Sequence, residues 1–242
     1  MTNHHAAHEQ SRFPASAVPT AVDAGLRRYL LGVYNAMAGG LALTGMVAYA
    51  GAASGFYASI AGTPFFWVIL LAPLAVVLLV SFRIEKMSVG AARFSFWIYA
   101  ALVGLSLSGI FLVYTGESIA RVFFISAATF GAMSLCGYTT NADLSRFRSL
   151  LFMGLIGIII AGLVNIFLVS SALQFAISVI GIIVFVGLTA YDTQRIKAIY
   201  AESDDPATAG KKSIMGALAL YLDFLNLFLL FLQHFGEQRH RR

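Results

Sequence analysis

Residues 214–232 read IMGALALYLDFLNLFLLFL, and residues 173–192 read LQFAISVIGIIVFVGLTAYD. Each stretch is apolar and long enough to cross a bilayer as a helix, yet each contains an aspartate, Asp223 in the first and Asp192 at the end of the second. An aspartate in the middle of a membrane helix costs roughly 2.5–3.5 kcal/mol on insertion scales, so the helix is expected to turn it towards the protein interior. The two stretches therefore predict helices that pack inside a membrane bundle.

The composition of the chain is typical of a membrane protein. Of its 242 residues, 59% are hydrophobic and only 11% are charged, which leaves too few polar side chains to cover a soluble domain of this length. A β-barrel is excluded, because the apolar residues run continuously and do not alternate as they do in barrel strands. The net charge of +5 does not call for a nucleic-acid partner, since positive loops are what orient a membrane protein.

Seven segments have the length of roughly 20 residues that a bilayer core of about 30 Å requires. They are residues 29–53, 64–82, 94–114, 122–139, 150–169, 174–192 and 214–233. The sequence thus predicts an all-α polytopic membrane protein with a single membrane domain over residues 26–236. We expect a polar, disordered tail over residues 1–25 and a short basic tail over residues 237–242.

The basic residues predict how the chain is inserted. Of the 16 lysines and arginines, twelve lie before the first segment or in the loops after the second, fourth and sixth, whereas the alternate loops hold only Arg121. The twelve are Arg12, Arg27, Arg28, Arg83, Lys86, Arg93, Arg146, Arg148, Arg195, Lys197, Lys211 and Lys212. The positive-inside rule then makes the N-terminus cytoplasmic.

The charges after the seventh segment, Arg239, Arg241 and Arg242, disagree with a seventh crossing. Seven full crossings would place these charges outside, so the segment either crosses despite them or re-enters and returns. We favour a crossing, because C-terminal charges count for less once six spans are fixed.

Each of the last two segments has a face of small and polar residues that includes its aspartate. At 100° per residue, Gly181 shares a face with Asp192, and Gly216 shares a face with Asp223. Two interpretations stay open: a buried hydrogen-bond clamp between the helices, or a protonatable pair that contacts ions, because adjacent carboxyl groups tend to share a proton. The aspartates meet only if the seventh segment begins deep or the sixth extends past its apolar limit.

The residues around the two aspartates resemble the Bax inhibitor-1 family, also called the YccA family. The strings that carry the resemblance are GLTAYDTQRIK at 187–197 and GALALYLDFLNLF at 216–228, and the likeness covers about residues 25–236. It implies a bacterial-type member with six helices around a central seventh. It also implies a pH-sensitive calcium leak in which Asp192 and Asp223 are the proton sensor.

The same resemblance implies further site residues. An arginine near the cytoplasmic end of the second helix is expected to latch onto Asp192, and Arg83 stands at that place, although it also fits a plain positive-inside anchor. Some relatives have another acid one turn before the second aspartate, where this chain has Ala219. The polar side chains expected to support the pair are Tyr191, Asn165 and Asn226.

We therefore expect a cation leak in a bacterial inner membrane, with the two aspartates as transient calcium contacts and no firm metal site, because calcium prefers oxygen ligands. No cofactor and no enzyme activity are expected. Intramembrane aspartyl proteases come nearest among enzymes, since they use a motif like Tyr191-Asp192. Their second motif has glycines, however, where this chain has Leu220-Tyr221-Leu222.

The alternative function is a membrane regulator that transports nothing and modulates stress or cell death through binding. Bacterial YccA-like relatives are associated with a membrane-bound ATP-dependent protease. The polar residues 1–25 would be the means of reaching such a partner, but their composition equally suits an inert tail.

Overall fold

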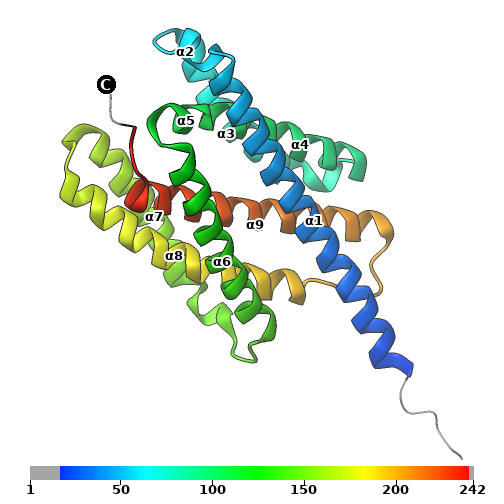
Figure 1. Ribbon diagram of the computed structural model, residues 1–242. Helices are drawn as coiled ribbons and strands as arrows, with labels where there is room; N and C mark the ends of the chain where they lie inside the picture. The colour runs from blue at the N-terminus through cyan, green and yellow to red at the C-terminus, as the bar shows by residue number, and fades with distance from the viewer. Residues whose placement is uncertain (1–16, 240–242) are drawn as a thin grey trace, which may run out of the picture.

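The structure is a computed structural model that describes the backbone of residues 17–239 and the side chains from Ala24 to Arg239. Its helices are α1 (Ala17–Ala53), α2 (Phe56–Ile60), α3 (Pro64–Arg83), α4 (Val89–Ser106), α5 (Ile110–Val113), α6 (Gly116–Thr139), α7 (Arg148–Leu168), α8 (Ser171–Ala198) and α9 (Pro206–Phe235). Within residues 17–239, seven helical segments are long and apolar enough to cross a membrane. The predicted class is confirmed: the protein is an all-α polytopic membrane protein (Figure 1).

The helix boundaries refine the predicted segments. Helix α1 begins at Ala17, inside the stretch expected to be a polar tail, and residues 1–16 of that stretch lie outside the described residues. The third span consists of α4 and α5, which a short 3-10 turn at Leu107–Gly109 joins. Helix α9 begins at Pro206, eight residues before the apolar run, so a polar N-terminal extension precedes its membrane part.

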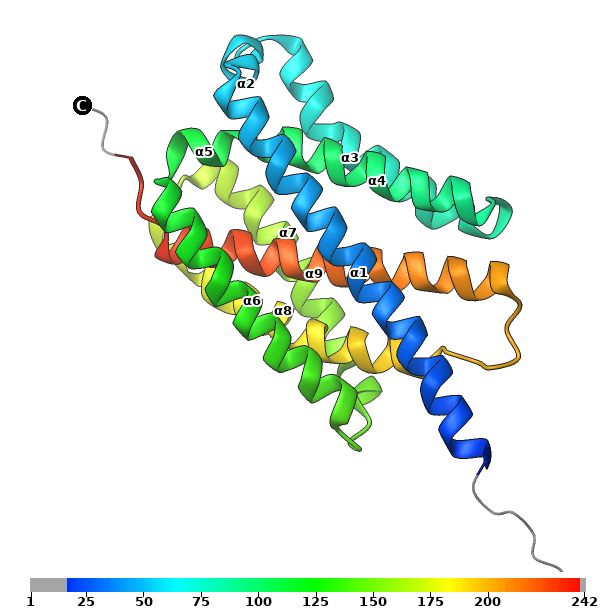
Figure 2. The same ribbon diagram turned by 45° about the vertical axis from the view of Figure 1, so that its right-hand side comes forward.

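Helix α9 is the centre of the bundle. It packs against α1, α4, α6 and α8, and both views show it running through the middle of the molecule (Figures 1 and 2). Helix α3 packs mainly on α4, and α7 packs mainly on α8, so both lie at the periphery. The central place of the seventh span, which the resemblance implied, is confirmed, with four spans packed directly on it and the spans of α3 and α7 outside those four.

Glycines let two pairs of helices come close together. A Cβ atom on Gly104 of α4 would lie 2.6 Å from the carbonyl oxygen of Thr44 on α1, and a Cβ atom on Gly137 of α6 would overlap the carbonyl of Ala190 on α8. Such close backbone approach is how helices pack in lipid, where no hydrophobic effect drives them together. The two contacts fix α1 against α4 and α6 against α8.

The two ends of the bundle differ in charge. One end carries the arginines and lysines of the predicted cytoplasmic loops, and we call it the basic end: Arg27, Arg83, Arg148, Arg195 and Lys211. The other, which we call the distal end, contains α2, the link between α5 and α6, and residues 236–239. The first described residues lie at the basic end and the last ones at the distal end (Figure 1).

Helix α9 runs through the bundle as one helix of 30 residues, and the chain after it does not turn back. Instead, the carbonyl oxygen of Glu237 accepts a hydrogen bond of 3.0 Å from the N–H of Thr115, and the N–H of Arg239 donates one of 2.8 Å to Val113. The Glu237 carboxylate also pairs with Arg121 at 2.8 Å. The last segment therefore spans the bundle, as favoured from the sequence, and is not re-entrant.

Candidate functional site

The structure brings Asp192 and Asp223 together in the interior of the bundle. Asp192 lies on α8 with a side chain only 15% exposed, and Asp223 lies on α9 with 4% of its surface exposed. The two carboxyl groups are neighbours in this interior. Oxygen Oδ2 of Asp223 is buried and has no hydrogen-bond partner among the described residues. The pair is thus a buried polar group with unused bonding capacity.

The polar extension of α9 explains why the two aspartates meet. Asp223 lies 17 residues after the start of α9, and Asp192 lies six residues before the end of α8, so their depths differ by about 16 Å when measured from those helix ends. The link over residues 199–205 has seven residues, which can span up to about 23 Å when extended. It carries the start of α9 beyond the end of α8, as both views show (Figures 1 and 2). Of the two sequence possibilities, the structure has the second, because α8 continues six residues past Asp192 to Ala198; the early start of α9 at Pro206 was not predicted.

The extension itself is held by polar contacts at the basic end. The Asp205 carboxylate caps α9 by accepting hydrogen bonds from the N–H groups of Ala207 and Thr208. Hydrogen bonds from Thr208 and Ala207 hold the pKa of Asp205 below its usual value, so the cap is an ionised carboxylate at neutral pH. Lys212 pairs with Asp204 at 2.6 Å, and Lys211 donates a hydrogen bond of 2.7 Å to the carbonyl of Glu85.

The ion partner of Asp192 in this structure is Arg195, one turn further along α8, at 3.9 Å. The expected latch arginine, Arg83, is exposed at the end of α3 and forms no ion pair with Asp192 in the described part of the chain. The reason lies in the packing: α3 and α4 lie on one side of α9 and α8 lies on the other (Figures 1 and 2). The predicted Arg83 latch is therefore absent from this conformation, and Arg195 is the guanidinium beside the pair.

Two of the expected supporting residues lie near the pair. Tyr191 precedes Asp192 and is half-buried. Asn226 follows Asp223 by one turn and donates its amide to the carbonyl of Leu222 at 2.8 Å. Asn226 also lines a cavity of about 330 Å³ on the distal side of Asp223, together with Phe185, Leu230 and Gln233.

Asn165 has a different place. Its amide donates to Gln174 at 2.9 Å, and its oxygen accepts from the N–H of Ser170 at 3.0 Å, so it holds the turn between α7 and α8 at the distal end. Gln174 and Asp192 are 18 residues apart on α8, or roughly 27 Å along the helix. Asn165 therefore stabilises a helix connection and does not support the aspartate pair.

Two buried hydroxyl clusters next to the aspartates were not expected from the sequence. Thr193 hydrogen-bonds Ser134 of α6 at 2.9 Å, and Ser134 in turn bonds the hydroxyl of Tyr34 on α1. Tyr221, two residues before Asp223, bonds Thr44 of α1 at 2.6 Å. The sequence signal that could have indicated these clusters is the presence of hydroxyl side chains within apolar segments. Which hydroxyl groups bond each other depends on how the helices pack and could not be read from the sequence.

The site does not have the ligands of a resident metal centre. No group of three or more His, Cys, Asp or Glu side chains that could hold a metal ion occurs within the described residues.

Comparison with known proteins agrees with this architecture. Residues 26–240 match the family described as "Inhibitor of apoptosis-promoting Bax1". The chain is 49% identical over 232 residues to the inner membrane protein YbhL of Escherichia coli (strain K12), covering 94% of this chain and 99% of YbhL.

Two further relatives have names that state no function. An uncharacterized protein of Rickettsia prowazekii is 50% identical over 218 residues, covering 90% of this chain and 92% of the relative. An uncharacterized membrane protein of Streptococcus pyogenes serotype M3 is 43% identical over 142 residues, which cover 59% of this chain and 62% of the relative. With its seven membrane helices and a family match over most of its length, the chain belongs to the Bax inhibitor family.

Proposed function

We propose that this protein is a pH-sensitive cation leak, with calcium as the ion, in which Asp192 and Asp223 both sense protons and contact the ion. The observation that carries the proposal is the contact between the two carboxyl groups, one of which keeps a buried oxygen without a partner. A buried polar atom without a partner destabilises the protein, so its presence in a membrane helix is an indication of function.

The chemistry of the pair supports a proton-linked cation site. Two carboxyl groups in contact hold a proton between them, because two bare carboxylates at this distance repel each other. A divalent cation can take the place of that proton, since it neutralises both charges and prefers carboxylate oxygens. Cation and proton would therefore compete for Asp192 and Asp223, and flux would respond to pH without any enzyme chemistry.

The surroundings of the pair offer an approach from either end. Asp192 lies near the exposed Arg195 at the basic end, and beyond Asp223 the 330 Å³ cavity lined by Asn226 and Gln233 leads towards the distal end. The near-complete burial of Asp223 suits a closed conformation. Opening would require α9 or its neighbours to shift by enough to join the cavity to the pair.

The pH dependence has two opposing parts. Protonation of the pair would release an arginine latch from another helix, which favours opening, and it also weakens attraction for the cation, which disfavours binding. The expected flux therefore has a maximum at intermediate pH. Arg83 stays the predicted latch, in a closed conformation other than this one, because Arg195 lies on the same helix as Asp192 and cannot hold two helices together.

We propose a bacterial inner membrane as the location, because the relative YbhL is named an inner membrane protein. The basic end would face the cytoplasm under the positive-inside rule. Reporter fusions test this orientation: those near Lys86 and Lys212 should report a cytoplasmic position, and those near Ser54 and Ser171 an external one. The reverse pattern would overturn the orientation.

The test of the leak is calcium flux into proteoliposomes between about pH 5 and 8, the range that brackets a perturbed carboxyl group. Asp192→Asn and Asp223→Asn keep the shape of each side chain but remove its titration, so each should flatten the pH profile. Asp143→Asn, at an exposed carboxylate of the loop before α7, is the matched control and should keep the wild-type profile. If both site variants kept wild-type flux at every pH, the leak would be wrong, and a membrane regulator that binds a partner such as an ATP-dependent protease would be favoured.

A further inference from the structure

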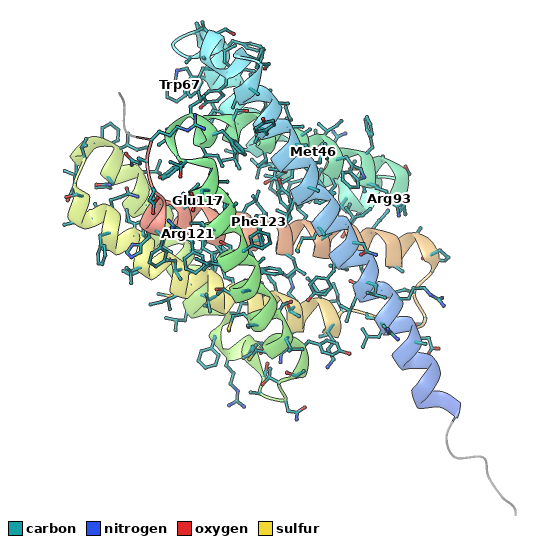
Figure 3. All side chains as sticks on the ribbon, in the orientation of Figure 1. Met46, Trp67, Arg93, Glu117, Arg121 and Phe123 are labelled. Atoms are coloured by element: carbon teal, nitrogen blue, oxygen red, sulfur yellow. The ribbon has the colours of Figure 1, made fainter. Side chains whose placement is uncertain are left out.

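A long groove runs between α1 and α6 on the flank of the bundle. Both helices pack against α9 but only sparsely against each other, and the space between them has a volume of about 870 Å³. Figure 3 labels Met46 on α1 and Phe123 on α6, which lie on the two walls of the groove near its distal end. Phe224 of α9 also lines it.

The groove has an apolar body that opens to the membrane. Leu31 and Leu135 on its two walls are largely exposed, at 51% and 62%. Arg27 and Met46 on the α1 wall are 19 residues apart, or roughly 28 Å along the helix, which is close to the thickness of a bilayer core of about 30 Å. The groove therefore lies along the membrane flank over most of its depth.

The mouth of the groove at the basic end is positively charged. Arg27 lines it from α1 and is exposed. Tyr138 lines it from α6, and Lys197 of α8 lies against Tyr138: the Lys197 ammonium donates a hydrogen bond of 2.9 Å to the Tyr138 carbonyl, and its Nζ lies 4.7 Å from the centre of the Tyr138 ring. Neither cation forms an ion pair with a carboxylate among the residues whose side chains the structure describes.

We infer that this groove is a binding site for an acidic phospholipid. The phosphate of the headgroup would lie between Arg27 and Lys197, and the acyl chains would lie along the apolar walls. Basic pockets between membrane helices recognise anionic headgroups in this way, and an amphipathic tyrosine at the same level suits the membrane interface. The unpaired cations at the mouth favour an acidic lipid over a neutral one and over an apolar helix.

Replacing either of two glycines by a larger residue would fill the groove with a side chain and leave the helices that form its walls in place. Gly45 on α1 and Gly131 on α6 both line it, and a Cβ atom on either would meet no atom within 4 Å. Gly131→Leu therefore occupies the groove with a side chain that favours a helix more than glycine does. Gly157→Leu is the matched control, because Gly157 lies on peripheral α7 and its Cβ position is equally open.

The experiment measures lipid retained by the full chain in native mass spectrometry, with phosphatidylglycerol or phosphatidylcholine of the same acyl chains added to the detergent. The wild type should retain phosphatidylglycerol in preference, Gly131→Leu should lose it, and Gly157→Leu should keep it. Arg27→Gln should lower the affinity for phosphatidylglycerol about fivefold, because one interfacial cation is removed. Arg148→Gln, at the basic end but on α7, should change nothing.

Three results would overturn the inference. The first is equal retention of both lipids by the wild type. The second is unchanged phosphatidylglycerol retention by a Gly131→Leu variant whose helical circular dichroism matches the wild type. The third is a wild-type dimer that Gly131→Leu converts to a monomer, because a second copy of the chain would then be the occupant of the groove.

Discussion

Helices α7 and α9 differ in where they lie: the more apolar helix, α7, is at the surface of the bundle, and the less apolar helix, α9, is in its interior. The span that contains α7 has a mean hydropathy of 2.6, and none of it is buried in the protein, whereas the span of α9 has a lower mean hydropathy of 2.0 and is 67% buried. A soluble protein would bury the more apolar helix. In a membrane, lipid solvates α7 as well as any protein interior would. The helix that lipid solvates poorly, α9, therefore occupies the centre of the bundle.

The residues of α9 show what makes it the central helix. Asp223 and Tyr221 need polar partners, and they find them in Asp192 of α8 and Thr44 of α1. A helix that carries such residues has to be surrounded on several sides. The comparison therefore predicts that polar changes on α7 and packing changes around α9 are harmful, while the reverse changes are mild.

The largest effect should come from a charge on α7. Ile160 is 56% exposed, on a surface that faces lipid, so Ile160→Asp should disfavour insertion by about 2.5–3.5 kcal/mol. The measurement is the fraction of full-length protein inserted in membranes, with Ile160→Val as the apolar control. Normal insertion of the aspartate variant would mean that α7 has a protein partner on that face.

The next largest effect should come from closing a tight helix contact. Gly137→Ala should destabilise the protein by about 1–3 kcal/mol, because the new methyl group overlaps the carbonyl of Ala190 and forces α6 away from α8. Gly157→Ala on α7 places its methyl in open space and should be neutral or slightly stabilising. Thermal unfolding in detergent compares the two, and equal melting temperatures would show that the α6–α8 contact is looser than described.

A smaller effect should follow from removing one buried hydroxyl beside the site. Tyr221→Phe takes away the partner of Thr44, which still donates to the carbonyl of Ala100 at 2.8 Å. Hydrogen bonds between membrane helices average about 0.6 kcal/mol and reach about 1.7 kcal/mol, so the loss of stability should fall in that range. Tyr49→Phe, at a tyrosine that is 63% exposed, is the control and should unfold as the wild type does.

The smallest effect on stability should come from removing the N-terminal cap of α9, which has no counterpart on α7. Helix α9 has the Asp205 cap, whereas Phe147 stands at the start of α7 and provides no side-chain cap. Because hydrogen bonds in the folded protein lower the pKa of Asp205, the cap stabilises at neutral pH and its contribution is lost as the pH falls through that lowered pKa. Asp205→Ala should therefore lower the melting temperature near neutral pH and make no difference in strong acid.

The control for the cap is Asp205→Asn, which keeps an accepting oxygen but does not titrate. It should retain most of the wild-type stability and lose its pH dependence at this position. If Asp205→Ala were as stable as the wild type near neutral pH, the polar extension of α9 would be held by Lys211 and Lys212 alone.

Much of the fold could be predicted from the sequence because the bilayer imposes a fixed length on each helix. The seven segments follow from runs of apolar residues, and the aspartates identify α8 and α9 as inner helices. The start of α9 could not be predicted, since Pro206 to Ser213 form no apolar run and their helix depends on the Asp205 cap and on contacts at the basic end.

The candidate site could be predicted in its two central residues but not in its partners. Asp192 and Asp223 stand out in apolar stretches, yet their relative depth depends on how residues 199–205 run. The expected Arg83 latch is not formed here, because α9 separates α3 from α8 and Arg195 is nearer in sequence and in space. Asn165 lies at the distal turn because Gln174 is its partner, and no sequence pattern indicated that pairing.

The central claim is that Asp192 and Asp223 act as one unit, and a double-mutant cycle on calcium flux tests it most directly. Proteoliposomes with the wild type, Asp192→Asn, Asp223→Asn and the double variant are compared across the same pH series. If the two carboxyl groups share one proton and one ion, either single change removes the pH response, and the double variant is no worse than the singles. Additive effects of the two substitutions, or a wild-type pH response in either single variant, would contradict the account.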